Sequence, residues 1–279
     1  MKTTILKRLQ SLARRASSGR WSIGTSVVAA LLLAPAKLAA LPSVQTISGG
    51  PSAGYVNGDT MQFALFHTPI GLVLDPTGNT LYVADRDNNA IRVLNLSGNL
   101  TYSFATYNVS HPVGVTLDKA GNVFVLNHGN GSDGSIVEFD TFGNFVGTLA
   151  SGLANANGFV FDGLTNLYVT VNGNSVIRIR PDGSTTTLTT IDAASIRLQG
   201  ITVLNSGWLA VADSLGNGIW IIDPTTGNPS QLTGFNGAGD HFGTKAFAKF
   251  NQPMGVAATG GGMLVVADYG NNRVKVVDS

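Results

Sequence analysis

Cysteine is absent from this sequence of 279 residues, and glutamate occurs only once, at Glu138. A chain without cysteine forms no disulfide bond, thiolate metal site or lipoprotein anchor, and it offers no cysteine nucleophile. Charged residues make up only 12% of the chain, whereas glycine occurs 35 times. Scarce glutamate beside abundant Gly, Asn, Thr and Val disfavours helices and favours strands and turns. The composition therefore predicts an all-β protein.

The first forty residues differ in composition from the rest of the chain. They combine several basic residues with an apolar run over residues 27–33, and the small-residue sequence Ala-Pro-Ala follows at 34–36. This order is typical of a secretory signal peptide. An uncleaved N-terminal anchor is the alternative, although the apolar run is short for a bilayer span. We predict a signal peptide over residues 1–40 and export of residues 41–279 into the periplasm or the medium.

Removal of that segment would change the charge of the protein. Seven of the 17 lysines and arginines lie within residues 1–40, whereas all 16 acidic residues follow it, so the remaining domain has a net charge near −6. An acidic domain repels phosphate backbones, and no stripe of basic residues is present to attract them. We therefore expect no nucleic acid among the partners, and no membrane span in the mature chain.

A short motif recurs five times after residue 60. Each copy has a leading glycine, usually a second glycine seven residues later, and in most copies an apolar run that ends at Asp or Asn. The leading glycines are Gly71, Gly114, Gly158, Gly200 and Gly255, so successive copies begin 42 to 55 residues apart. A period of about 40 to 50 residues with strand-like content indicates the blades of a β-propeller.

The first copy shows how one blade divides into strands. Alternating apolar residues between turn residues predict strands over 71–75, 81–84, 91–94 and 99–105. Four antiparallel strands joined by short turns make one blade of a propeller. The sequence therefore predicts five four-stranded antiparallel blades within residues 41–279.

The N-terminal part of this domain suggests how the ring closes. The fifth copy contains three predicted strands, and residues 43–49 resemble the outer strand predicted at 230–234. We predict that this N-terminal strand closes the last blade, because closure protects the edges of a sheet from pairing with other chains. The alternative is a truncated ring of six or seven blades.

Two segments resemble a known repeat family. The sequences PIGLVLDPTGNTLYVADRDNNAIRV at 69–93 and PMGVAATGGGMLVVADYGNNRVKVVD at 253–278 are similar to NHL repeats, and the resemblance extends over nearly all residues after 45. The resemblance implies a propeller fold. NHL propellers serve as protein or RNA interaction modules, as extracellular sensor domains and, in a few related families, as metal-dependent lyases or lactonases.

The blades of a propeller converge where each innermost strand begins, so binding or catalysis is expected there. The residues directly before the leading glycines form one ring: Ile70, Val113, Asn157, Gln199 and Met254. The residues two positions earlier form a second ring: Thr68, His111, Asn155, Arg197 and Gln252. Convergent polar groups beside an apolar wall are typical of a small-ligand site, although such groups also satisfy backbone atoms or hold channel water. The candidate ligand-binding residues are His111, Asn155, Asn157, Arg197, Gln199 and Gln252.

Neither a metal ion nor another cofactor is predicted. Propellers of the gluconolactonase and senescence-marker type hold a divalent cation with Glu, Asn and Asp placed just before such glycines, and only Asn157 matches that pattern here. Hard cations require charged oxygen ligands, and the neutral Ile70 and Gln199 supply none. The four histidines of the chain are too few at converging positions for a catalytic zinc site.

A carboxylate or carboxamide recurs at the end of the second predicted strand. The positions are Asp85, Asn127, Asp213 and Asp268. Turn residues follow them, and Asx side chains commonly cap such turns. We therefore predict a structural role for these residues, as caps of the next turn, and we assign no catalytic residue.

The favoured function is that of a secreted, non-catalytic and monomeric propeller. It is predicted to bind a protein, a cell-wall component or a glycan at the mouth of the channel. The glycine-rich connections 49–62 and 234–246 are expected to form rim loops that expose Tyr55, Phe235 and Phe242.

The alternative function is a metal-dependent or histidine-based lyase or lactonase that acts on a small molecule. In that case His111 would be the general base, and Arg197 would stabilise an anionic intermediate.

Overall fold

The computed structural model describes residues 46–59, 63–163 and 165–278. The chain divides into two compact units, Met1–Gln45 and Thr46–Ser279, and the described residues all belong to the second unit. The predicted signal peptide therefore lies outside the described residues, and export stays a prediction. Within the second unit the regular structure is almost entirely β-strand.

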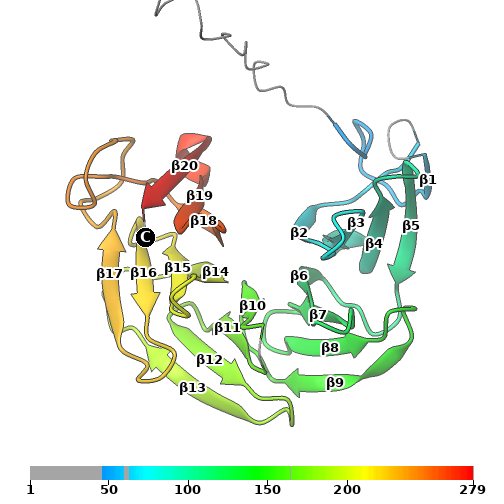
Figure 1. The fold of residues 1–279 in the computed structure, drawn as a ribbon, viewed down its shortest axis with the longest axis horizontal. Coiled ribbons are helices and arrows are strands. Elements are labelled where there is room, and N and C mark those ends of the chain that lie inside the picture. Colours follow the sequence, from blue (N-terminus) through cyan, green and yellow to red (C-terminus); the bar gives the residue numbers. More distant parts are fainter. Residues whose placement is uncertain (1–45, 60–62, 164, 279) are drawn as a thin grey trace, which may run out of the picture. The chain divides into compact units, whose positions relative to one another are not determined.

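Five antiparallel sheets, called blades 1 to 5 below, follow one another along the chain (Figure 1). Blade 1 contains β2 (Pro69–Leu74), β3 (Thr80–Asp85), β4 (Ala90–Asn95) and β5 (Leu100–Ala105), with the short β1 (Gly58–Asp59) paired to β5. Blade 2 contains β6 (Pro112–Leu117), β7 (Val123–Asn127), β8 (Ser135–Phe139) and β9 (Phe145–Ser151). Blade 3 contains β10 (Phe159–Phe161), β11 (Leu167–Val171), β12 (Ser175–Ile179) and β13 (Thr185–Thr190).

Blade 4 contains β14 (Leu198–Val203), β15 (Leu209–Asp213), β16 (Gly218–Ile222) and β17 (Pro229–Thr233). Blade 5 contains β18 (Pro253–Ala258), β19 (Met263–Asp268) and β20 (Arg273–Asp278). Single turns of 3-10 helix, η1 (Arg86–Asn88) and η2 (Tyr269–Asn271), follow the second strands of blades 1 and 5. The predicted fold, an all-β propeller with five antiparallel blades, is confirmed.

Apolar side chains pack between neighbouring blades. The second strands β7, β11 and β15 are buried along their whole length, because each lies inside a sheet that is covered on both faces. Separate apolar clusters join blade 1 to blade 2, blade 2 to blade 3, blade 3 to blade 4, and blade 4 to blade 5. Burial of this apolar surface is the main contribution that holds the blades together.

The leading glycines mark the closest approach of neighbouring innermost strands. A Cβ atom added at Gly71 would lie 2.7 Å from the Cα of Gly114, and one at Gly200 would lie 3.0 Å from the Cα of Gly255. A Cβ added at Gly158 would lie 2.5 Å from the backbone oxygen of Gln199. Only glycine fits at these three positions, so the repeated glycine is required by the close packing of one blade on the next.

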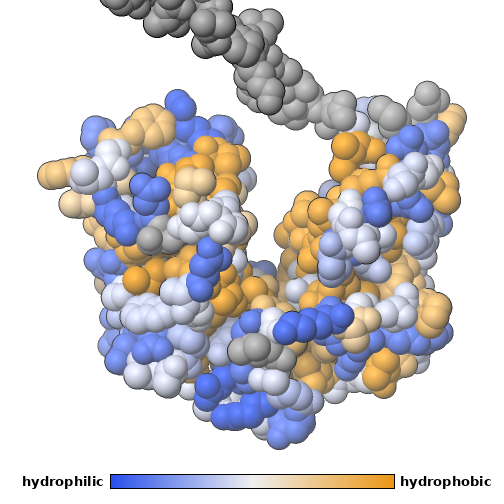
Figure 2. All heavy atoms as spheres, viewed as in Figure 1, coloured by the Kyte–Doolittle hydropathy of each residue, from blue (hydrophilic) through white to orange (hydrophobic). Residues whose placement is uncertain are grey.

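The ring of blades is open between blade 5 and blade 1. Strand β2 lies beside β6, β10 beside β14, and β14 beside β18, whereas no described strand of blade 5 packs in this way against β2. Figure 1 shows the two end blades on opposite sides of the opening, and Figure 2 shows apolar surface on both facing walls. Leu72 of blade 1 is 66% exposed and Val274 of blade 5 is 73% exposed.

The prediction that residues 43–49 close the last blade is wrong for the part that is described. Residues 43–45 lie outside the described residues, and 46–49 contain no strand. The hydroxyl of Ser48 lies 3.0 Å from the hydroxyl of Thr101 on β5, so this segment lies against blade 1. The segment does not reach blade 5 because the ring is open between blades 5 and 1. Blade 1, to which the segment is attached, is its neighbour instead.

Candidate functional site

A cavity of about 600 Å³ lies at the centre of the blades. It is lined by residues at or near the start of each innermost strand, β2, β6, β10, β14 and β18. All five residues of the first predicted ring line it: Ile70, Val113, Asn157, Gln199 and Met254. No lining residue is ionisable, and the remaining wall consists of glycine, alanine, aliphatic residues and Phe159.

β-Bulges place the first-ring side chains on the cavity wall. In four blades the pairing between the first two strands shifts register at the ring position, for example between Pro69 and Leu72 in blade 1 and between Leu198 and Ile201 in blade 4. A bulge adds an unpaired residue and re-aims its side chain. The residues in these bulges include Ile70 and Gln199, which therefore face the cavity.

Four of the six candidate residues share a second, smaller pocket. Asn155, Asn157, Arg197 and Gln199 line a pocket of about 450 Å³ together with His128 and Leu215. The Nδ2 atom of Asn157 donates to the backbone oxygen of Asn155 at 3.1 Å. Asn157 and Gln199 belong to both spaces, so they connect this polar pocket to the neutral central cavity.

The structure places His111 and Gln252 away from these walls. Neither residue lines the central cavity or the smaller pocket. Both have a left-handed backbone, with φ of 44° and 51°, and so do the equivalent Thr68 and Asn155. The conformation recurs from blade to blade, which indicates a structural turn into the innermost strand. The prediction that all six polar residues face one funnel therefore does not hold for His111 and Gln252.

The backbones of His111 and Gln252 are held by hydrogen bonds to the preceding blade. The N–H of His111 donates to Oδ1 of Asn89 in blade 1, at 2.8 Å. The N–H of Gln252 donates to Oδ1 of Asn217 in blade 4, at 2.9 Å. At these two junctions, an asparagine after the second strand of one blade holds the entry to the next blade.

The recurring Asp and Asn residues at the ends of the second strands are structural, as predicted, but their main contacts differ from the prediction. Oδ1 of Asp85 accepts the N–H of His67 at 2.7 Å, and Oδ1 of Asp268 accepts the N–H of Asn251 at 2.7 Å. Asn127 and Asp213 accept the N–H groups of Ser110 and Arg197 in the same way. These side chains therefore fasten the chain that enters the innermost strand, and Asp213 in addition caps its own turn at Leu215 and Gly216.

Two buried cations were not found by the sequence analysis. Arg92 is fully buried and its Nη1 atom lies 3.0 Å from Oδ2 of Asp85. Lys275 occupies the equivalent position in blade 5, with its Nζ atom 2.7 Å from Oδ2 of Asp268. A signal was present, because each cation follows its aspartate by seven residues.

The same cations hold the glycine-rich connections against blades 1 and 5. Arg92 donates to the backbone oxygen of Val56 in the first connection and to that of Leu65, which follows it. The Nζ atom of Lys275 lies 2.9 Å from Oδ1 of Asp240 in the second connection and donates to the backbone oxygen of Lys249, which follows it. The connections therefore pack on the third strand and the outer part of their blades, which corrects the prediction that they form rim loops of the channel. Tyr55 and Phe242 are exposed as predicted, whereas Phe235 is partly buried against Trp220.

Two histidines and one carboxylate, His111, His128 and Asp87, lie near the entry to blade 2. Burial lowers the pKa of His128 below its ordinary value, and Arg86 and His111 lower it further. A hydrogen bond from Thr68 lowers the pKa of Asp87. The Nδ1 atoms of His111 and His128 are buried and have no hydrogen-bond partner among the described residues.

Neither a metal-ligand cluster nor a membrane-spanning helix is present in residues 46–59, 63–163 and 165–278. Within these ranges, no three His, Asp or Glu side chains lie close enough together to hold a metal ion. Within the same ranges, no helix has the length and apolarity that crossing a bilayer requires.

Sequence comparison supports the repeat assignment. The family profile described as "NHL repeat" matches residues 66–94 and 250–277, which cover blade 1 and blade 5. The protein SUPPRESSOR OF QUENCHING 1, chloroplastic, of Arabidopsis thaliana is 33% identical over 88 residues. That alignment covers 30% of this chain and only 8% of the plant protein, so the chain spans a small part of that relative's length.

Solved structures share the fold at low sequence identity. A nidogen/laminin complex contains a chain that matches 77% of this one and is itself covered to 78%, with a TM-score of 0.64 and 22% identity. An auxiliary nutrient binding protein of Bacteroides thetaiotaomicron matches 84% of the chain, is covered to 61%, and has a TM-score of 0.69 and 18% identity. A streptogramin B lyase matches 75% of the chain and is covered to 68%, with a TM-score of 0.55 and 14% identity. At these identities the likeness concerns the fold alone.

Proposed function

We propose that this β-propeller, whose first and last blades match the NHL repeat, is an exported, non-catalytic scaffold that binds a glycan or a peptide at its central cavity. The NHL propeller fold supports a binding or scaffolding role in general, and the ligand class is our proposal. A cell-wall glycan is the preferred ligand, and an extended protein segment is the other member of the class.

The chemistry of the central cavity carries this proposal. Its polar side chains, Asn157 and Gln199, are neutral carboxamides, and each offers both a donor and an acceptor. The opposite part of the wall is aliphatic and includes Ile70 and Met254, both of which are exposed. Sugars and peptide groups present neutral donors and acceptors beside apolar faces, so they fit such a wall better than an ion does.

The pocket beside the cavity extends the same chemistry. Arg197 and His128 line it together with the carboxamides of Asn155 and Asn157. An arginine there suits an acidic substituent on a mainly neutral ligand, because its guanidinium binds carboxylates through two hydrogen bonds. Acidic sugars and sugar–peptide conjugates, which occur outside cells, have this combination of groups, and this agrees with the predicted signal peptide.

Isothermal titration calorimetry with the exported domain tests the proposal. Cell-wall oligosaccharides, neutral oligosaccharides and short peptides form the panel. Gln199→Ala is expected to weaken binding about fivefold, since one hydrogen bond contributes about 1 kcal/mol. Gln231→Ala is the matched control, because Gln231 is exposed on the outer strand β17 and should leave affinity unchanged. Binding that is insensitive to Gln199→Ala would place the ligand elsewhere and refute the proposed site.

A histidine-based reaction is the second candidate function. One observation favours it: the buried Nδ1 atom of His111 has no hydrogen-bond partner among the described residues, and His128 lies close enough to His111 for their charges to interact. The test is hydrolysis or elimination of a panel of lactones, with His111→Ala expected to abolish turnover while the circular dichroism spectrum is retained. Turnover that persists in His111→Ala would exclude His111 as the base.

A further inference from the structure

The third strand of each complete blade pairs with a fourth strand in the same irregular way. The shared irregularity lies between the second and third residues of the third strand, where the pairing in blades 1 to 4 skips one residue of the fourth strand. In blade 1, for example, Ile91 pairs with Ala105 and Arg92 pairs with Ser103, so Phe104 is skipped. The skipped residues are Phe104, Leu149, Leu188 and Leu232. Blade 2 has an additional bulge at Val146.

These bulges give the fourth strand a short sequence motif. The skipped residue is Phe or Leu, the residue before it is Ser, Thr or Gln, and the residue after it is Ala or Thr. The four versions are Ser-Phe-Ala at 103–105, Thr-Leu-Ala at 148–150, Thr-Leu-Thr at 187–189 and Gln-Leu-Thr at 231–233. All four skipped side chains pack into or against the apolar clusters between blades, so the motif has a clear physical role.

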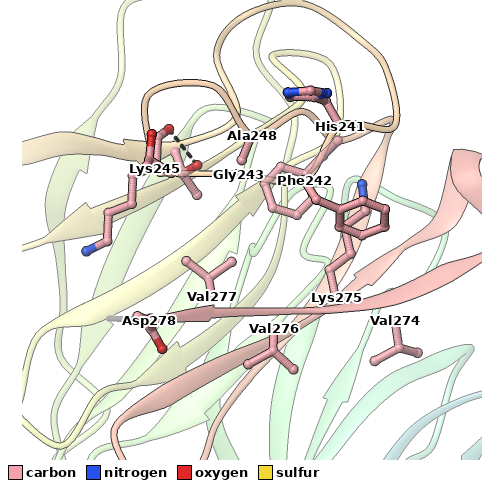
Figure 3. Close-up of a pocket in the computed structure, with 13 residues that line it drawn as sticks. His241, Phe242, Gly243, Lys245, Ala248, Val274, Lys275, Val276, Val277 and Asp278 are labelled. Atoms are coloured by element: carbon pink, nitrogen blue, oxygen red, sulfur yellow. Dashed lines mark hydrogen bonds between the residues drawn. The ribbon is translucent and has the colours of Figure 1, made fainter.

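Blade 5 has the third strand but lacks a fourth among the described residues. Strand β20 pairs with β19 along its whole length, and no described strand pairs with its other edge. A pocket of about 460 Å³ runs along that edge. Figure 3 shows its walls, with β20 from Val274 to Asp278 on one side and the connection that carries Phe242, Lys245 and Ala248 on the other.

Blade 1 shows what occupies the equivalent place. Its connection packs on the outer strand β5: the hydroxyl of Tyr55 lies 2.5 Å from that of Ser103, and Gly58 pairs with Thr101. The connection of blade 5 is held by Lys275 just as that of blade 1 is held by Arg92. The two blades therefore present the same surroundings, and only blade 1 fills them with a described strand.

We propose that the edge of β20 and the neighbouring pocket accept an extended segment of another protein as the fourth strand of blade 5. The segment lies antiparallel to β20 and carries the motif Ser/Thr/Gln, then Phe/Leu, then Ala/Thr. By equivalence with Ile91 and Arg92, its last motif residue lies opposite Val274 and its first lies opposite Lys275. Strand addition to a free sheet edge is a general mode of peptide recognition, in which the ladder gives affinity and side-chain pockets give specificity.

A different protein is a better occupant than a second copy of this chain. The four motif-bearing strands of this chain are each paired inside their own blade. The similar sequence Thr46-Ile47-Ser48 lies against blade 1, where Ser48 contacts Thr101. A second copy therefore has no described motif strand to donate, and we assign the segment to a partner that presents the motif in an extended, unpaired form.

Fluorescence anisotropy with labelled peptides tests the proposal on the purified protein. The probes are the sequences of residues 98–107 and 226–235, which contain the motifs of β5 and β17. Two further versions of each peptide are N-methylated at alternate backbone amides. One set of amides faces β20 and the other faces away, so one version should lose at least tenfold in affinity and the other should bind as the parent does. Equal binding by all versions would overturn the proposal.

Hydrogen exchange locates the bound peptide. Alternate amides within Arg273–Asp278 are expected to become protected when the peptide binds. Protection confined to the central cavity would overturn the proposal. Protection that appears without peptide as the protein concentration rises, together with a dimer in sedimentation, would show that a second copy is the occupant and would equally overturn it.

A pair of variants completes the test. Ala248→Trp fills the pocket beside β20 and is expected to weaken peptide binding at least tenfold. Ala120→Trp adds the same bulk at an exposed turn of blade 2 and should leave peptide binding unchanged. If Ala248→Trp does not fold, the N-methylated peptides and hydrogen exchange still decide the outcome, because both use the unaltered protein.

Discussion

Alanine at the leading glycines should reveal which blades have a neighbour. Gly200 and Gly255 occupy equivalent positions at the bulges of β14 and β18, and neither has a positive φ, so alanine is compatible with both backbones. A Cβ at Gly200 would lie 2.8 Å from the backbone oxygen of Met254. A Cβ at Gly255 would meet only the Cβ of Ala267, at an ordinary 3.5 Å. The two substitutions therefore differ in one respect, the presence of a neighbouring strand.

The difference in stability follows from two opposing effects. Replacing glycine with alanine restricts the unfolded chain and stabilises the protein by about 0.4 to 1 kcal/mol where the native backbone permits it. Overpacking costs about 1 to 3 kcal/mol, and backbone atoms yield less easily than side chains. Gly255→Ala is therefore expected to be neutral or slightly stabilising. Gly200→Ala is expected to lower the free energy of unfolding by about 2 kcal/mol, and Gly71→Ala and Gly158→Ala should behave like it.

Urea unfolding followed by tryptophan fluorescence measures this difference, since Trp208 and Trp220 both lie in blade 4. In a domain of this size, about 2 kcal/mol corresponds to a shift of about 4 to 8 °C in Tm. A loss of stability in Gly255→Ala as large as that in Gly200→Ala would contradict this expectation. That result would mean that another backbone lies beside β18 in solution and that the ring is closed there.

Three further predictions concern charged groups. Asp85→Ala leaves Arg92 buried without its counter-ion and should lower the free energy of unfolding by about 3 to 5 kcal/mol, measured in urea, and a loss below about 1 kcal/mol would contradict the buried pair. Hydrogen bonds, above all the one from the Asn144 side chain, lower the pKa of Asp140. The ionised carboxylate therefore stabilises the fold above the pKa that Asp140 has in the unfolded chain, about 4, and this contribution is lost as the pH falls below about 4. Asp140→Asn should therefore reduce the change of the urea midpoint between pH 5 and pH 3. An unchanged pH dependence would contradict the hydrogen bonds described for Asp140. Burial lowers the pKa of His128, so stability should also decline as the pH falls through about 6.5, and His128→Gln should remove that part of the decline in melting temperature.

The repeat pattern predicted the fold because each repeat contains the contacts that build it. The leading glycines are required where innermost strands approach, and the Asp or Asn at the end of the second strand fastens the entry to the first. Both are local or nearest-neighbour contacts, so their residues recur at a fixed period. The first ring was predicted for the same reason, since its position is fixed by the glycine that follows it.

The closure of the ring could not be predicted in the same way. The likeness of residues 43–49 to the strand at 230–234 is real at the level of the motif, because Thr46-Ile47-Ser48 resembles Gln-Leu-Thr at 231–233. The sheet edge that accepts such a strand depends on how far the ring has turned after five blades. That total rotation is the sum of the angles between successive sheets, and the sequence of a single repeat does not determine it. His111 and Gln252 were misplaced for a different reason: none of the second-ring residues lines the central cavity, and only Asn155 and Arg197 of that ring line the smaller pocket.

The residue seven positions after each second-strand aspartate donates to that buried carboxylate. Asp85 and Asp268 are matched by Arg92 and Lys275, and the third acid, Asp213, accepts a hydrogen bond from Nε1 of Trp220 at 3.2 Å. Blade 2 has the neutral Asn127 at the acid's position, and the residue at the donor's place in its third strand is Val137. A buried carboxylate requires a buried donor, whereas a carboxamide can satisfy itself on nearby backbone, as Asn127 does on the oxygen of Asn108.

Within this chain, the buried acid and its donor therefore occur together or are both absent. The two blades with a full cation are also the two whose glycine-rich connections bind to it, which is why blades 1 and 5 resemble each other more than either resembles the blades between them. The similarity of the end blades thus reflects a shared way of holding a connection against a third strand. The free edge of β20 lies beside one of these connections, in surroundings that its counterpart in blade 1 uses to hold a fourth strand.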